Sequence, residues 1–102
     1  RSEAAMTRVY TERKGKETLV ALEGHATGRE DVCAAVSGLV CAYIGYLQNS
    51  GDAVKKCVTE PGHVRIVSEG DGIEAYNMLV IGLMQLAAAA PEHVKIDQAE
   101  IF

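Results

Sequence analysis

The sequence predicts one two-layer α+β domain, in which two helices pack on a mainly antiparallel sheet. Short β-prone runs occur in pairs around glycine-containing turns, and each pair precedes a longer stretch with apolar residues at helical spacing. The expected order is strand, strand, helix, strand, strand, helix and an optional last strand. The 102 residues suit a single compact domain without a linker.

The first half of the chain supplies a hairpin and a helix. The runs "MTRVYTER" (residues 6–13) and "TLVALE" (residues 18–23) flank "KGKE", whose glycine relaxes the turn. Apolar residues then recur at helical spacing from Val32 to Leu47. We expect Asp31 to cap this helix at its N-terminus and Asn49, Ser50 and Gly51 to stop it.

The second half repeats the pattern approximately. The runs "AVKKCVTE" and "HVRIVSE" flank "PG", which indicates a second hairpin. A second helical stripe extends from Ile73 to Ala87 and ends before Pro91, because proline cannot continue a helix. The run "HVKI" is the optional last strand.

The domain is expected to span residues 6–102. Residues 1–5 are interpreted as an expression remnant or a disordered N-terminus, with Met6 as a natural start. Both helices are apolar over more than one face, although a two-layer domain buries only one face of each. This surplus predicts a homodimer, and it comprises Cys41, Ala42, Met78, Leu79, Ile81 and Leu86.

Composition argues against several classes of function. The net charge is −4 and the basic residues are scattered, which disfavours nucleic-acid binding. The longest apolar stretches are interrupted and too short for a membrane span, and no secretory signal is visible, so we expect a cytoplasmic protein. The three cysteines have no metal-ligand spacing, which favours reduced thiols, no metal and no cofactor.

The candidate site lies in "EGHATGREDVCAAVSG", residues 23–38. His25 follows Gly24 where the second strand should end, and Cys33 falls in the first turn of the helix. A short loop brings a strand end close to the next helix. A helix N-terminus favours a thiolate, a neighbouring histidine can accept the thiol proton, and free backbone N–H groups can hold an oxyanion.

The same residues also have ordinary explanations. A cysteine beside alanines is often a small core residue, and a histidine at a strand end is often a surface group. Glu30 and Asp31 oppose a thiolate unless Arg29 or a protonated His25 offsets them. The two other histidines, His63 and His93, follow turn signals and are interpreted as solvated loop residues.

Four segments of the chain are similar to those of a known family, namely "GHA", "DVCAAVSGLV", "GHVRIVS" and "MLVIGLMQL". With these segments the sequence resembles the bacterial ribosomal-processing cysteine protease family, Prp. The resemblance implies a small homodimeric endopeptidase that removes the N-terminal extension of a large-subunit ribosomal protein, the twenty-seventh, after paired phenylalanines. It also implies that Cys33 is the nucleophile and His25 its general base.

The family pattern also marks supporting residues, and the chain departs from it in two places. Ser37 matches the family's serine one helical turn after Cys33, although a helix-interior hydroxyl that bonds a carbonyl fits equally well. Gly24 and Asp31 are the other supporting candidates. The loop after His25 is shorter than usual and lacks a second glycine, and the acid before Cys33 is replaced or shifted by one position.

These departures leave two alternatives open. One is a catalytically silent paralogue that binds an extended peptide or a partner protein. The other is a paralogue that processes a different substrate, such as a phage structural protein.

Overall fold

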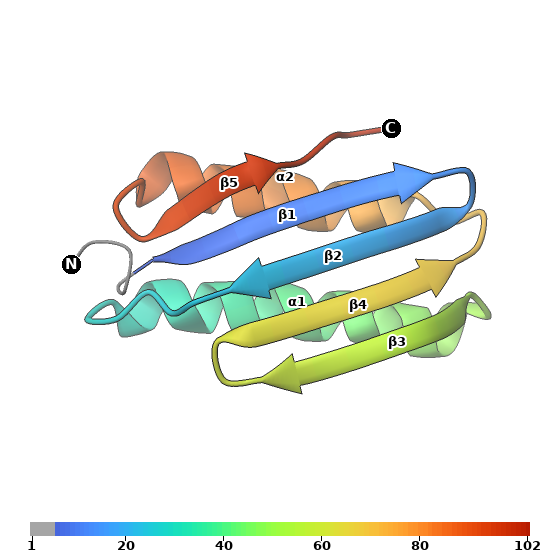
Figure 1. Ribbon diagram of the computed structural model, residues 1–102, viewed down its shortest axis with the longest axis horizontal. Helices are drawn as coiled ribbons and strands as arrows, with labels where there is room; N and C mark the ends of the chain where they lie inside the picture. Colours follow the sequence, from blue (N-terminus) through green and yellow to red (C-terminus); the bar gives the residue numbers. More distant parts are fainter. Residues whose placement is uncertain (1–5) are drawn as a thin grey trace.

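Five strands form one sheet in the order β3-β4-β2-β1-β5, and two helices cover one of its faces (Figure 1). The computed structural model describes residues 6–102, and the interpretation of residues 1–5 lies outside this range. The elements are β1 (Thr7–Lys14), β2 (Glu17–Glu23), α1 (Glu30–Ser50), β3 (Ala53–Glu60), β4 (His63–Glu69), α2 (Glu74–Ala89) and β5 (Val94–Gln98). The predicted two-layer α+β class is therefore confirmed.

The sheet is antiparallel except at one edge. The β1–β2 and β3–β4 hairpins form as predicted, and β2 pairs with β4 to join them, with Glu23 opposite His63. The last strand forms as well, and it pairs parallel to β1 at the edge. A parallel neighbour requires a crossover, which α2 supplies between β4 and β5.

Alternating burial along the strands places the core between the sheet and the helices. Val9, Val20 and Ile66 point from the sheet into this layer, and Tyr76 and Leu83 reach it from α2. The buried Tyr76 hydroxyl donates a hydrogen bond to Thr11 Oγ1 at 2.9 Å. The polar end of this large side chain is therefore satisfied inside the core.

Two details of the helices differ from the sequence expectations. Asp31 lies inside the first turn of α1 and is not its N-cap, because the helix begins at Glu30 after Arg29 and has no side-chain cap. In α2, Leu79 is buried in the core and does not belong to the exposed apolar surplus, whereas Met78 and Ile81 are exposed as predicted.

Helix α1 is longer than the sequence pattern indicated. With 21 residues, α1 is long and apolar enough to cross a membrane, judged by length and composition only. This differs from our expectation that the apolar stretch is too short to span a membrane. Core helices of soluble proteins meet the same criterion, and Val32, Val40, Tyr43 and Leu47 of α1 are buried against the rest of the domain.

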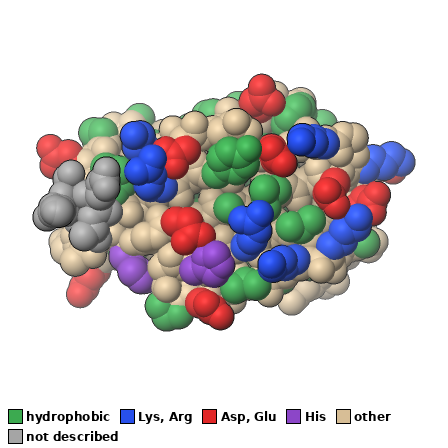
Figure 2. Space-filling view, in the orientation of Figure 1, with side chains coloured by type: hydrophobic (Ala, Val, Ile, Leu, Met, Phe, Trp, Pro, Cys, Tyr) green, Lys and Arg blue, Asp and Glu red, His purple; other side chains and the backbone are tan. Residues whose placement is uncertain are grey.

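Three segments meet at one end of the molecule. These are the end of β2, the start of α1 and the turn between β3 and β4, which lie together at the left of Figure 1. The open face of the sheet carries histidine side chains beside acidic groups at this same end (Figure 2). The candidate site residues of the sequence analysis fall here.

Candidate active site

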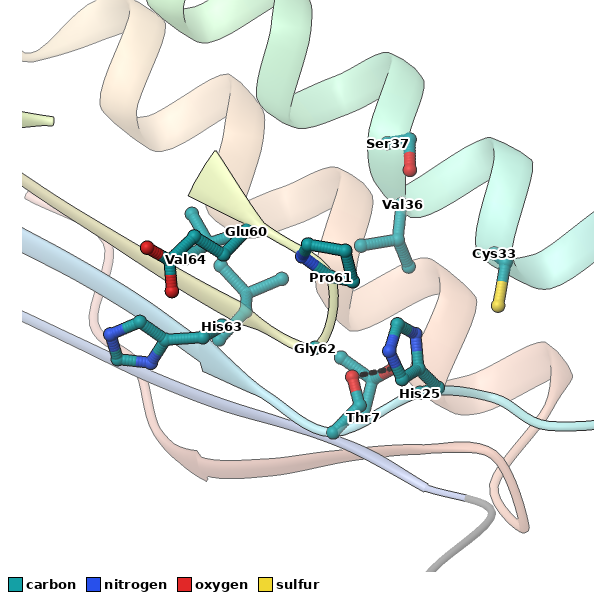
Figure 3. A pocket seen from close by; sticks show the side chains of 12 residues that line it. Thr7, His25, Cys33, Val36, Ser37, Glu60, Pro61, Gly62, His63 and Val64 are labelled. Carbon is teal, nitrogen blue, oxygen red and sulfur yellow. Dashed lines mark hydrogen bonds between the residues drawn. The ribbon is translucent and has the colours of Figure 1, made fainter. Parts of the chain in front are cut away.

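A cavity of about 150 Å³ lies where these three segments meet. Four of the five candidate site residues line it, namely Gly24, His25, Cys33 and Ser37. Figure 3 labels the last three of these. Leu22, Val36 and Val64 give the cavity apolar walls, and the β3–β4 turn closes one side of it. The fold thus brings the predicted histidine and cysteine to one hollow.

Cys33 sits in the first turns of α1 and is half-buried. Its Sγ points toward the loop after β2 and donates a hydrogen bond to the Ala26 carbonyl at 3.5 Å. Its own backbone N–H donates to the Arg29 carbonyl at 3.0 Å. The Cys33 amide is therefore already used within the protein, and any oxyanion donor has to come from another group.

His25 follows a glycine that the backbone requires. Gly24 has a φ of +91°, and a Cβ at this position would lie 2.2 Å from the Met6 carbonyl oxygen. Any L side chain would be strained here, because the left-handed conformation and the close backbone approach both exclude it. Gly24 therefore fixes the path of the chain into His25, which is a structural reason for its presence at the site.

Ser37 and Asp31 have different surroundings. Ser37 lines the cavity one turn after Cys33, as the helical spacing predicts, and its side chain is exposed. Asp31 does not line the cavity. Its carboxylate receives two hydrogen bonds from the Arg29 guanidinium, at 3.0 and 3.1 Å.

An ion pair between Arg29 and Asp31 places a positive charge against one of the two acids at the start of α1. The hydrogen bonds from Arg29 hold the pKa of the Asp31 carboxyl below its usual value, so this acid is ionised and paired at neutral pH. Of the two acids beside Cys33, only Glu30 is left without this guanidinium partner. The sequence left open whether Arg29 offsets the acids, and the structure shows that it pairs with one of them.

The β3–β4 turn is the part of the site that the sequence analysis missed. Glu60, Pro61 and Gly62 line the cavity, and so does His63, which the sequence predicts to be a solvated loop residue. His63 instead begins β4, and its Nδ1 lies 2.5 Å from Glu23 Oε2. The "EPGH" turn signal was visible, but no local pattern indicated that this turn folds against the end of β2.

Comparison with known proteins supports the fold. No protein-family model matches the sequence, and no curated protein sequence matches it. The ribosomal processing protease Prp from S. aureus, in complex with a substrate peptide, superposes with a TM-score of 0.75 at 18% identity, covering 90% of this chain and 98% of that one. The chain shares the fold of Prp.

A second Prp structure gives the same result. The S. aureus enzyme in complex with a covalently linked product peptide superposes with a TM-score of 0.70 at 18% identity, covering 89% of this chain and 95% of Prp. The resemblance to Prp stated from the sequence is thus confirmed at the level of the fold. The two chains also match over nearly their whole lengths.

Proposed function

We propose that this protein is a cysteine endopeptidase in which Cys33 is the nucleophile and His25 is the general base. The observation that carries this proposal is that both residues line one cavity at the start of α1, in a fold shared with a peptide-cleaving enzyme. A dyad of this kind is sufficient for peptide cleavage, because a third residue mainly orients the histidine. The chemistry needs no cofactor.

The proposed reaction has two halves. First, the Cys33 proton passes to His25 while Sγ attacks the scissile carbonyl carbon, and the imidazolium then protonates the leaving amine as the C–N bond breaks. The product is a thioester on Cys33. Water next gives a proton to His25 and attacks the thioester carbon. The C–S bond then breaks to release the carboxylic acid, and the His25 imidazolium returns its proton to the sulfur to regenerate the thiol.

Ser37 is proposed to assist this reaction from the wall of the cavity. Its hydroxyl is a donor on the same face of α1 as Cys33, one turn further into the helix. Since the amide of Cys33 donates to Arg29, a side-chain donor of this kind is suited to the charge that develops on the substrate oxygen. Asp31 lies outside the cavity, and its proposed role is indirect: its pairing with Arg29 affects the charge near Cys33.

The proposed substrate is the N-terminal extension of a large-subunit ribosomal protein, cut after paired phenylalanines. The apolar walls formed by Leu22, Val36 and Val64 suit an apolar side chain next to the scissile bond. Ribosomal processing would place the protein in the cytoplasm, without a role at membranes or on nucleic acid. A phage structural protein with the same apolar cleavage sequence is the alternative substrate.

The proposed enzyme is a homodimer. Met78 of α2 is 65% exposed, and Tyr46 of α1 and Ile81 of α2 are also exposed. A shallow, mostly apolar groove lies between the two helices, lined by Ala35, Gly38, Leu39, Gly82, Gln85, Leu86 and Ala89. Large exposed apolar side chains around a shallow groove are typical of a self-association surface.

One observation favours the second candidate, a catalytically silent paralogue that binds an extended peptide or partner protein. The Cys33 thiol donates its hydrogen bond to the Ala26 carbonyl oxygen at 3.5 Å, a backbone group that does not accept the proton as a general base does. In this case the cavity would hold a peptide without cleaving it.

Mass spectrometry of a peptide that carries paired phenylalanines tests the proposal. Wild type, Cys33→Ala and His25→Ala are incubated with the peptide, and Cys57→Ala serves as a matched control because Cys57 is exposed on β3, away from the cavity. We expect cleavage by wild type and Cys57→Ala only. Equal cleavage by Cys33→Ala would show that the mechanism is wrong, and binding of the peptide without cleavage would favour the silent paralogue.

A further inference from the structure

The turn between β3 and β4 packs directly on the imidazole of His25. A Cβ built on Gly62 would lie 2.8 Å from Nε2 and 3.1 Å from Cδ2 of that ring. Real Cβ atoms do not approach other atoms so closely, so only a glycine leaves room for the ring in its present place. Figure 3 shows the ring beside this turn, at the side of the cavity that faces Cys33.

The backbone around this contact is fixed from two sides. The Gly24 N–H, one residue before His25, donates to the Gly62 carbonyl at 2.9 Å. The strands that continue from these two residues are paired, with Glu23 opposite His63. The Cα of Gly62 is therefore held at a set position relative to the backbone that carries the imidazole.

We infer that Gly62 is a positioning residue for His25, because its bare Cα forms the surface against which the imidazole rests facing Cys33. This inference rests on the proposed function, in which His25 is the general base. Gly62 touches neither the substrate nor the Cys33 sulfur in this account, and it acts only through the ring of His25. Because Gly62 has no side chain, the imidazole can occupy its observed position beside the turn. A side chain at this position would displace the ring.

The chain offers a matched control for this inference. Gly15, in the turn between β1 and β2, has a φ of +61°, close to the +73° of Gly62, but a Cβ at Gly15 would meet nothing within 4 Å. Gly15→Ala and Gly62→Ala therefore carry a similar backbone strain. They differ in that only the second introduces an atom against the His25 ring.

The experiment compares the two variants in the full chain. The alkylation rate of Cys33 by iodoacetamide is followed against pH by peptide mass spectrometry, and the His25 ring resonances are followed by NMR over the same range. In Gly62→Ala we expect alkylation at neutral pH to slow by about tenfold, because a base displaced from its place in the cavity is poorly oriented to accept the thiol proton. The ring resonances should also shift. Gly15→Ala should stay within about twofold of wild type, with unchanged ring resonances.

Equal behaviour of the two variants would overturn the inference. If Gly62→Ala fails to fold, the double variant His25→Ala/Gly62→Ala tests whether the contact with the His25 ring is the reason. Removal of the ring should restore folding if the new Cβ disrupts the fold through that contact. Failure of that double variant as well would overturn the inference. An unreactive Cys33 in wild type would instead count against the proposed function, while the NMR comparison still reports the contact.

Discussion

The Cys33 thiol donates a hydrogen bond to the Ala26 carbonyl oxygen at 3.5 Å, across the loop that joins β2 to α1. Ala26 directly follows His25, so the bond holds the proposed nucleophile beside the residue that carries the proposed base. Because the thiol is the donor, its proton is directed at the Ala26 carbonyl oxygen in this arrangement. Formation of the nucleophile then requires the thiol to turn this proton away from the carbonyl and transfer it to the imidazole of His25.

Loss of the Arg29 side chain is predicted to slow alkylation of Cys33. In Arg29→Ala, Asp31 loses its largest source of pKa lowering, and its unpaired negative charge disfavours a thiolate nearby. The effect should be roughly twofold at neutral pH, because the pair is exposed. Arg29→Lys retains the charge and serves as the control, so an equal loss in both variants would contradict an electrostatic cause.

The lowered pKa of Asp31 also predicts a pH dependence. The folded-state pKa lies below the ordinary aspartate value, so the stabilising contribution of the pair is fully present at neutral pH. It declines as the pH falls below that ordinary value and is lost as the pH passes through the lowered one. Titration of the Asp31 carboxyl by NMR should give a higher pKa in Arg29→Ala than in wild type, and an unchanged pKa would refute the pairing.

Gly24→Ala is predicted to destabilise the fold strongly. The new Cβ would collide with the Met6 carbonyl oxygen in addition to the strain of a positive φ, and together these should cost about 3 kcal/mol or more. Gly15→Ala carries only the backbone strain, about 1 kcal/mol. Urea unfolding of both variants measures the difference, which should vanish if the contact with Met6 does not constrain the chain.

Tyr76→Phe is predicted to lower the free energy of unfolding by about 1–2 kcal/mol. The substitution removes the buried hydrogen bond to Thr11 and leaves that hydroxyl without its donor. Tyr10→Phe is the matched control, because its hydroxyl bonds Glu12 at an exposed position. Denaturant unfolding should show almost no change in the control, and equal losses would argue against a special role of the buried bond.

The exposed apolar residues of α2 predict a change in oligomeric state. Met78→Glu places a charge at an apolar side chain of α2 that is 65% exposed, one helical turn before Gly82 of the helix groove, and should convert the proposed dimer to a monomer. Lys14→Glu, at an exposed position at the end of β1, should leave the dimer intact. Sedimentation at micromolar concentration measures both, and a monomeric wild type would rule out the dimer.

Local patterns were sufficient to predict most of the fold. The glycine turns at "KGKE" and "PG" and the apolar spacing of the two helices predicted six elements in order, with both hairpins, and the run "HVKI" indicated the last strand as an option. The strand order was not predictable, because the pairing of β2 with β4 and of β5 with β1 depends on contacts between distant segments. The start of α1 was misplaced because Asp31 is a good cap by residue type, yet here it pairs with Arg29.

In the candidate site, too, the residues that are close in sequence were predictable and those from distant segments were not. His25, Cys33 and Ser37 are close in sequence, with His25 after the end of a strand and the other two on successive turns of the next helix. Their spacing was therefore sufficient to predict that they lie close together, and all three line the same cavity. Gly62 and His63 reach that cavity only through the β2–β4 register, which no local pattern specifies. Their part in the site became visible only in three dimensions.

The central claim is that Cys33 is an activated nucleophile, and site-resolved alkylation tests it without knowledge of the substrate. Cys41 and Cys57 are exposed whereas Cys33 is half-buried, so access alone would make Cys33 the slowest of the three. We predict that iodoacetamide labels Cys33 at least about tenfold faster than Cys57 at neutral pH, and that His25→Ala removes this advantage. Labelling of Cys33 no faster than Cys57 would contradict the account.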